Sequence, residues 1–215
     1  MVKYIREPVN AFTHLFGAIM AIIGLIALIE KASQTSGTSL SIVAVSVFGI
    51  SMILLYAASA SYHTVIAKDS TIALFRRIDH AMIFVLIAGT YIPFCLISLN
   101  DTTGWILFWV ISSIAIAGIL FKLIWFHAPR WLSTILYIAM GWIVIFYSGA
   151  LAPVIGPNGM GYLIAGGLFY TIGAFIYWLK PGFLSFKHMG FHEIFHIFIL
   201  FGSLCHFICI YQYVL

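Results

Sequence analysis

Long apolar runs separated by short polar breaks make up most of this chain. Most runs are about 20 residues long, the length of an α-helix that crosses the ~30 Å hydrocarbon core of a bilayer. We place seven helices at residues Asn10–Glu30, Leu40–Ala67, Arg76–Ser98, Gly104–Phe126, Trp131–Leu151, Gly161–Leu179 and Phe191–Val214. The pattern predicts an all-α fold, a seven-helix transmembrane bundle in which residues 1–215 form a single domain.

The polar breaks contain residues that are typical of turns and helix ends. Residues 33–39 are rich in Ser, Thr and Gly, residues 100–104 form a turn, and residues 127–129 end a helix at a proline. Residues 152–161 hold two prolines and three glycines, so we expect a loop there. No break is long enough to separate two domains.

The composition excludes a soluble protein. Hydrophobic residues make up 63% of the chain and charged residues 7%, against roughly 45–50% and about 25% in an ordinary globular domain. The net charge of +4 comes from basic residues that stand singly or in pairs, which does not fit a nucleic-acid surface. The three cysteines lie in apolar runs and are expected to be small core residues: Cys95, Cys205 and Cys209.

The basic residues predict the orientation of the bundle. Lys31 falls on one face, and the other nine basic residues fall on the opposite face: Lys3, Arg6, Lys68, Arg76, Arg77, Lys122, Arg130, Lys180 and Lys187. Because cytoplasmic loops carry an excess of Lys and Arg, the N-terminus is expected in the cytoplasm and the C-terminus outside the cell. A G-protein-coupled receptor has the opposite orientation and is therefore excluded.

Several polar residues lie inside the predicted spans, where each costs free energy and is a functional candidate. His63 lies at the inner end of the second helix, and we expect Asp79 within about one turn of the inner end of the third. The motif F-H-E-I-F-H puts His192 and His196 in the first two turns of the last helix. Three helices therefore bring His and Asp side chains to a similar depth.

The spacing of His192 and His196 suits a metal ion. Residues four apart project from one face of a helix, about 6 Å apart along its axis, so two imidazoles can hold one ion. We infer that His63 is the third ligand and that the metal is zinc, in a three-histidine site of the catalytic type. Asp79 would orient or deprotonate water, with Ser59, one turn before His63, as a nearby hydroxyl.

Other polar residues are expected to have supporting roles. Glu193 should contact another helix or the surface, and His206 should make a structural hydrogen bond in the outer half. His14 could be an outer partner of the site. Interfacial positions are expected for three further histidines: His80, His127 and His188.

Alternatives without a metal remain open at this point. A pair of histidines four apart is a weak signal, and a histidine in a membrane often hydrogen-bonds a neighbouring helix. A proton pathway would need polar residues across the bilayer, but the outer half offers only His206 and scattered hydroxyls. A retinal protein is excluded because the last helix has no lysine.

The motifs resemble the hemolysin III family, within the progestin and adipoQ receptor superfamily that includes the adiponectin receptors. They are E-P-V-N-A-F-T-H at residues 7–14, S-A-S-Y-H at 59–63, R-R-I-D-H at 76–80, and H-E-I-F-H followed by His206. The resemblance implies zinc bound by His63, His192 and His196, with Asp79 and Ser59 around the activated water. It also implies a cytoplasmic N-terminus and a multi-pass protein of the plasma membrane.

The resemblance also implies a function. Members of the superfamily and the similar alkaline ceramidases are associated with hydrolysis of lipid amides, so an intramembrane zinc hydrolase acting on a ceramide-like or fatty-acyl lipid of the inner leaflet is expected. The alternatives are a non-catalytic, zinc-stabilised regulator of membrane lipid homeostasis and a pore-forming hemolysin. No nucleic-acid partner is expected, and the sequence does not determine the oligomeric state.

Overall fold

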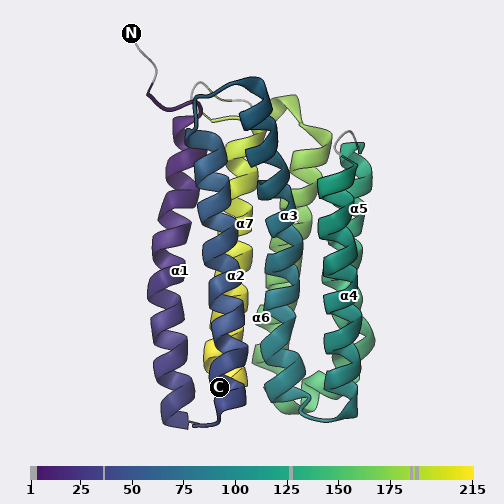
Figure 1. Ribbon diagram of the computed structural model, residues 1–215. Coiled ribbons are helices and arrows are strands. Elements are labelled where there is room, and N and C mark those ends of the chain that lie inside the picture. Colours follow the sequence, from purple (N-terminus) through teal and green to yellow (C-terminus); the bar gives the residue numbers. More distant parts are fainter. Residues whose placement is uncertain (1–3, 36, 126–127, 185, 187–188) are drawn as a thin grey trace.

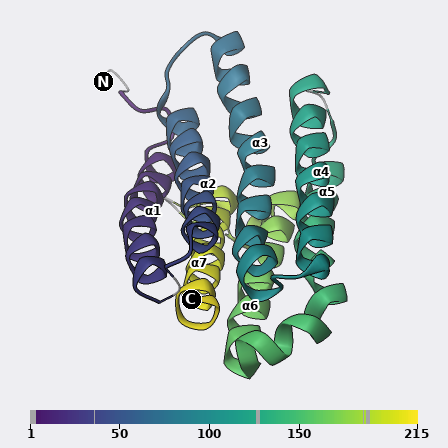
Figure 2. The same ribbon diagram turned by 60° about the horizontal axis from the view of Figure 1, so that its bottom comes forward.

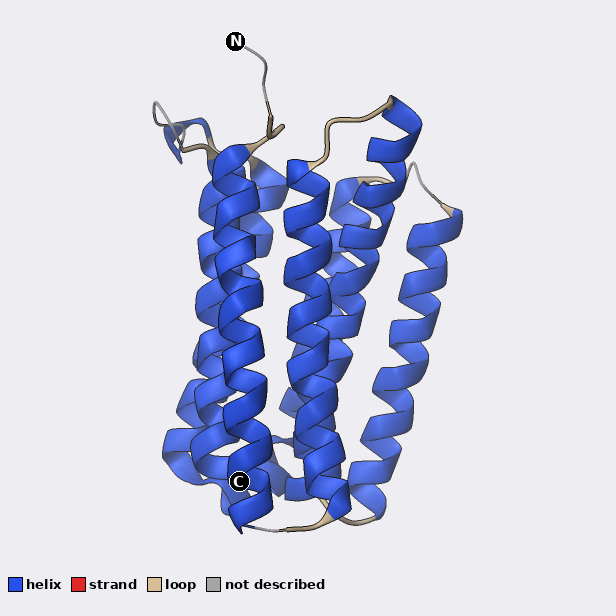
Figure 3. Cartoon of the chain, turned by 60° about the vertical axis from the view of Figure 1, so that its left-hand side comes forward, coloured by secondary structure: helices blue, strands red, loops and turns tan. Residues whose placement is uncertain are grey.

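The computed structural model describes residues 4–35, 37–125, 128–184, 186 and 189–215, and its regular elements there are helices (Figures 1 and 3). The first four helices are α1 (Pro8–Thr35), α2 (Ser39–Thr64), α3 (Asp69–Pro93), which continues as the π-helix η1 (Phe94–Ser98), and α4 (Thr102–Ile124). They are followed by α5 (Arg130–Gly141), the 3-10 helices η2 (Trp142–Tyr147) and η3 (Gly182–Leu184) on either side of α6 (Ser148–Leu179), and α7 (Phe191–Cys209), which ends in the π-helix η4 (Ile210–Val214). The all-α prediction is confirmed.

Six helical segments of the described chain are long and apolar enough to cross a membrane: Pro8–Thr35, Ser39–Thr64, Asp69–Ser98, Thr102–Ile124, Arg130–Leu179 and Phe191–Val214. Their outward faces are apolar, with Ile26, Ile116 and Trp109 each at least 60% exposed. Lipid stabilises such a surface, and each helix satisfies its own backbone hydrogen bonds. The chain is an integral membrane protein.

The fifth segment, Arg130–Leu179, contains α5, η2 and α6 and runs for 50 residues. The expected loop at residues 152–161 is wrong, because these residues are helical on both sides of Gly156. Gly156 takes a positive φ of 67°, and Pro157 follows it, where its fixed φ and missing N–H suit the first turn of a new helix. The prolines and glycines therefore bend the helix and do not unwind it into a loop.

Helix α3 begins earlier than expected. It starts at Asp69, not at Arg76, and projects beyond its neighbours (Figure 2). An acidic residue in the first turn is stabilised by the positive end of the helix dipole. Asp79 therefore lies about 15 Å along the helix from its start, not within one turn of it. The predicted end of the fourth helix, Phe126, falls outside the described residues.

The helices pack so that α7 contacts both α1 and α6, although α1 and α7 lie at opposite ends of the sequence. Figure 2 shows α1, α2 and α7 grouped on one side, α4 and α5 on the other, and α3 and α6 between them. The N-terminal and C-terminal ends of the chain lie at opposite ends of the bundle (Figure 1). This arrangement brings the starts of α1 and α7 next to the end of α2.

Small residues permit close helix contacts near Gly17 and at residues 165–167. A Cβ at Gly17 would lie 2.8 Å from Leu200 Cδ2 and 2.9 Å from Tyr56 Cδ1, so no larger residue fits there without movement. A Cβ at Gly166 would lie 2.6 Å from the His206 ring. The three cysteines are free; Cys95 and Cys209 are buried core residues, as expected, whereas Cys205 is only half-buried.

Candidate metal centre

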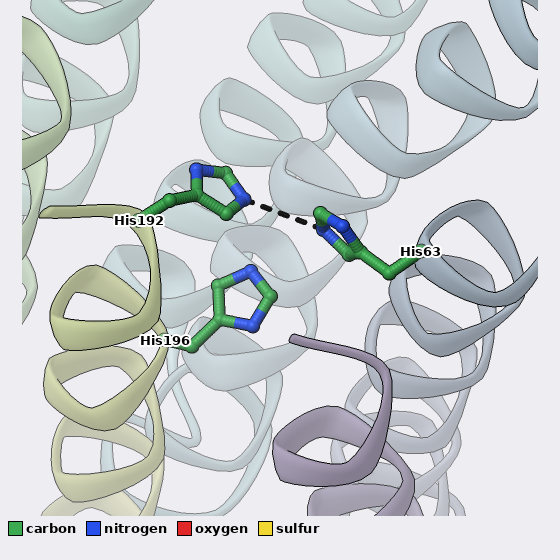
Figure 4. A group of neighbouring side chains, drawn as sticks. All are labelled: His63, His192 and His196. Carbon is green, nitrogen blue, oxygen red and sulfur yellow. Dashed lines mark hydrogen bonds between the residues drawn. The ribbon is translucent and has the colours of Figure 1, made fainter. Parts of the chain in front are cut away.

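Three histidines converge where α1, α2 and α7 meet (Figure 4). His63 lies in the last turn of α2, and His192 and His196 lie in the first two turns of α7. One ring nitrogen from each lies within 4.8 Å of the other two. His63 and His196 are each only 1% exposed. The group could hold a metal ion.

The spacing of the rings fits a tetrahedral ion such as zinc. His192 Nε2 and His63 Nε2 are 3.3 Å apart (Figure 4). Two nitrogens bound at about 2.0–2.1 Å to one tetrahedral zinc ion lie roughly 3.3–3.4 Å apart. The separation therefore matches a pair of zinc ligands, and imidazole is a donor that zinc prefers.

Glu7 fixes the orientation of the His63 ring. Its Oε2 lies 2.5 Å from His63 Nδ1, and because a carboxylate only accepts, Nδ1 donates and Nε2 is left to face the other histidines. The backbone N–H of Glu7 also donates to the His63 carbonyl at 3.0 Å. This carboxylate–histidine arrangement is common around protein-bound metals, where it raises the basicity of the ligand.

Partial burial raises the pKa of Glu7, but the hydrogen bond and charge of His63, with Arg6 and Asn10, bring it below its ordinary value. Glu7 therefore carries a negative charge at neutral pH. It stands just before the first membrane-spanning helix, at the edge of the histidine group. A negative charge at this place favours a bound cation.

Thr13 plays the same part for His196. The Thr13 hydroxyl donates to the Asn10 carbonyl at 3.0 Å and lies 3.3 Å from His196 Nδ1. With its proton committed to the carbonyl, the hydroxyl oxygen accepts from Nδ1, and Nε2 of His196 is left as the ligand atom. The Asn10 side chain in turn donates to Glu193 on α7 at 2.9 Å.

Sequence reasoning missed Glu7, Asn10 and Thr13 as parts of this site, although it noted the segment that contains them. Residues 7, 10 and 13 recur every three positions, so they share a face of the start of α1. A polar face on an otherwise apolar transmembrane helix is a signal that could have found them.

Asp79 and Ser59 lie on the side of the site away from α1. The Ser59 hydroxyl is hydrogen-bonded to the Asp79 carboxyl group, which joins α2 to α3. Both residues line a cavity together with His192 and His196. Asp79 also lines a second cavity, to which His63 and His192 contribute. The carboxylate predicted to act on water therefore borders the same space as the histidines.

The two cavities differ in character, and each has a volume of about 420 Å³. The first, which we call the deep cavity, runs between α3, α5, α6 and α7, and its wall is mostly apolar, with residues such as Phe94, Met160 and Leu163. The second is polar and includes Glu7 and Asn10. Both share the wall formed by Asp79, His80 and His192, so the histidine site lies at their junction.

The remaining polar residues have mixed outcomes. Glu193 contacts another helix through Asn10, as expected, and its Oε2 accepts from the Gly190 N–H at 2.8 Å. His14 stacks on His196 with ring centroids 3.6 Å apart, a direct contact with the site. His80 lines both cavities and so forms part of the wall of the site. Four residues with predicted roles fall outside the described part of the chain: Lys3, His127, Lys187 and His188.

We expected His206 to make a structural hydrogen bond, and its Nδ1 does not make one with the described residues. Its Nδ1 is buried without a hydrogen-bond partner among residues 4–35, 37–125, 128–184, 186 and 189–215. The ring packs on Gly166 and lies 5.4 Å from the Tyr170 ring, measured between centroids. Packing therefore accommodates this histidine.

Comparison with known proteins finds relatives that match almost the whole chain. A family model described as haemolysin-III related matches residues 2–207. Hemolysin-3 of Bacillus cereus is 42% identical over 217 aligned positions, which cover 100% of this chain and 95% of the relative. The hemolysin-3 homolog of Bacillus subtilis (strain 168) is 38% identical over 209 positions, 97% of this chain and 94% of the relative. The chain therefore belongs to the haemolysin-III related family.

Proposed function

We propose that this protein is an intramembrane, zinc-dependent hydrolase of lipid amides or esters. One observation carries the proposal: three histidines and a carboxylate lie at the junction of a polar cavity and an apolar one. The polar cavity supplies water, and the apolar cavity suits an acyl chain. Hydrolysis of a lipid requires both at the same place.

The proposal includes seven spans in the plasma membrane, with a cytoplasmic N-terminus. A straight helix of 50 residues would measure about 75 Å, more than twice the ~30 Å hydrocarbon core, so Arg130–Leu179 is proposed to cross twice and turn back near Gly156. Termini at opposite ends of the bundle fit an odd number of crossings. The bias in basic residues assigns the N-terminal end to the cytoplasm.

His63, His192 and His196 are the proposed zinc ligands. Bound there, zinc would polarise the substrate carbonyl and lower the pKa of water at the site. Glu7 and Thr13 hold the His63 and His196 rings with Nε2 toward the ion. Asp79 is the proposed general base that accepts the proton from the attacking water, and Ser59 holds its carboxylate in position.

The test compares purified zinc-loaded protein with an Asp79→Asn variant on a panel of ceramides, acyl amides and glycerolipids. We expect fatty acid release from the native protein and a fall of about 10²–10⁴-fold in the variant, the usual contribution of a general base. Zinc content should stay the same, since Asp79 is not a ligand. Equal and negligible release by the loaded protein, the variant and a chelated control would refute a hydrolase.

A second candidate is a non-catalytic role in which zinc joins helices. The site ties α2 to α7 directly and reaches α1 through Glu7 and Thr13, which favours a stabilising ion. It predicts that removal of zinc lowers the thermal unfolding temperature while no lipid of the panel is cleaved. The names of the relatives also suggest haemolysis, which dye release from erythrocyte-like vesicles would test.

A further inference from the structure

The wall of the deep cavity carries an excess of positive charge at its end nearest the histidines. Four basic residues line it, and Asp79 is the one acidic residue of the described chain that does so. The basic residues come from three helices: Arg76 and Arg77 from α3, Lys122 from α4 and Arg130 from α5. A mostly apolar cavity with such an end is shaped for an amphiphile.

Of these four basic residues, Lys122 is the one whose position is not explained by a role in setting the orientation of the helices in the membrane. It is only 7% exposed, whereas Lys68 and Lys180 are exposed. A lysine near a helix end ordinarily extends to the membrane surface. Lys122 instead directs its Nζ inward, where it donates to Ser133 Oγ at 2.9 Å. A buried ammonium group with a neutral partner costs free energy unless an anion offsets its charge.

In the described part of the chain no carboxylate forms an ion pair with Lys122, and the charge of Asp79 acts on Arg76. Among the described residues, the ion pairs join Glu7 to Arg6 and to His63, and none includes Lys122, Arg76 or Arg130. Arg130 stacks on the Tyr177 ring at 5.4 Å from its centroid, and its Nη1 is buried without a hydrogen-bond partner. Donors are therefore left over at this end of the cavity.

The three cations lie near a common neighbour, His80. Lys122, Arg76 and Arg130 all lie close enough to His80 for their charges to act on its ring. Arg76 and Arg130 act in the same way on His192, a proposed zinc ligand. The cationic group is therefore adjacent to the histidine site and opens into the same cavity.

We propose that the deep cavity binds a lipid whose anionic, phosphate-bearing head group lies between Arg76, Lys122 and Arg130 and whose acyl chain extends into the apolar part. A phosphate monoester carries about −1.5 to −2 charges at neutral pH and several acceptor oxygens, so it can satisfy donors from three helices at once. Arginine is well suited to phosphate because its donors form a planar fork. As the substrate class of the hydrolase, this assignment rests on the proposed function; as a binding site, it stands alone.

The test measures binding to the purified full-length protein in neutral detergent, without added zinc. The probes are oleoyl lysophosphatidate, the neutral monoolein and inorganic phosphate. We expect lysophosphatidate to bind about tenfold or more tightly than either, because only it offers both a charged head and an apolar chain. Equal binding of monoolein would exclude the cationic head-group site. Equal binding of inorganic phosphate would exclude the lipid.

Substitutions at single residues test whether lysophosphatidate binds at the proposed position in the deep cavity. Lys122→Met should weaken lysophosphatidate binding about tenfold or more and leave monoolein unchanged. Lys68→Gln removes the same charge from an exposed position and should bind as the native protein does. Ser133→Ala removes the hydrogen bond to Lys122 but keeps the charge, and it should also retain binding. If Lys122→Met does not fold, Arg130→Gln provides the same comparison; unchanged binding in the folded variant refutes the proposal.

The binding and hydrolysis measurements together distinguish a failure of the head-group site from a failure of the proposed hydrolase activity. A protein that binds lysophosphatidate through Lys122 but cleaves no lipid has the head-group site and another function. A protein that cleaves neutral amides and binds all three probes alike is a hydrolase without the head-group site. Zinc content, measured on each variant, shows whether the histidine site has been disturbed.

Discussion

Helix α7 carries buried histidines at two levels, and their surroundings differ. His196 is 1% exposed, bonded to Thr13 and stacked on His14, with His63 and His192 beside it. His206, at 6% exposure, packs on Gly166 and Tyr170 instead. A polar residue inside a membrane is a functional candidate, but burial alone does not make a site. The other histidines and their partners, which converge on His196 from α1, α2 and α7, distinguish its level from that of His206.

The largest expected effect comes from loss of a ligand. His192→Ala should lower the zinc affinity about 10²–10³-fold, since roughly 10–16 kcal/mol of zinc binding is shared among the ligands. Competition titration against a chromogenic chelator measures this. Size exclusion and circular dichroism check that the variant is folded. A folded variant with native affinity would remove His192 from the ligand set.

Glu7→Gln should have the next largest effect. It keeps the size of the side chain but removes the charge that holds the His63 ring, and loss of such an outer partner typically costs about 10–100-fold in metal affinity. The same titration measures it. Glu30→Gln, at the exposed far end of α1, is the matched control and should leave the affinity unchanged. Equal effects of the two substitutions would show that Glu7 acts only through overall charge.

A smaller change is expected for Thr13→Val, which keeps the shape and removes the hydroxyl next to His196. One neutral hydrogen bond contributes about 1 kcal/mol, so the zinc affinity should fall roughly fivefold. Thr35→Val, at the other end of α1, serves as the reference. A drop as large as that of a ligand variant would mean that the substitution moves α1 itself.

The smallest effect is expected at the level of His206. His206→Leu should change the zinc affinity by less than about twofold, and replacement of a buried polar group that lacks a partner is often close to neutral for stability. Zinc titration and the thermal unfolding temperature measure the two effects. Loss of zinc from this variant would show that the metal site extends along α7 to His206, and the two levels would then not differ in function.

Much of this organisation could be predicted from the sequence, because lipid permits few alternatives to an apolar helix. The last helix was placed at Phe191–Val214, the range that α7 and η4 occupy together. The i, i+4 spacing of His192 and His196 puts them on one face whatever the rest of the chain does. Local rules of this kind need no knowledge of tertiary structure.

The predictions that were wrong or incomplete concern features that depend on the lipid and on the helices that surround each residue. Turn residues predicted a loop at residues 152–161, but the chain is helical on both sides of Gly156, and the break is confined to that residue. The third helix was predicted to begin at Arg76, yet α3 begins at Asp69. The roles of Glu7 and Thr13 depend on which helices become neighbours, and the spacing within one helix does not contain that information.

The distance between the histidines along the sequence also limits how early a metal ion can bind while the chain is being synthesised. His63 and His192 are separated by 129 residues, so a ribosome that adds about 5–20 residues per second makes the second one roughly 6–26 s after the first. During that interval the early helices enter the membrane with only one of the three proposed ligands, His63. Metal capture can follow only once the final helix has docked, so a bound ion would report that membrane insertion is complete.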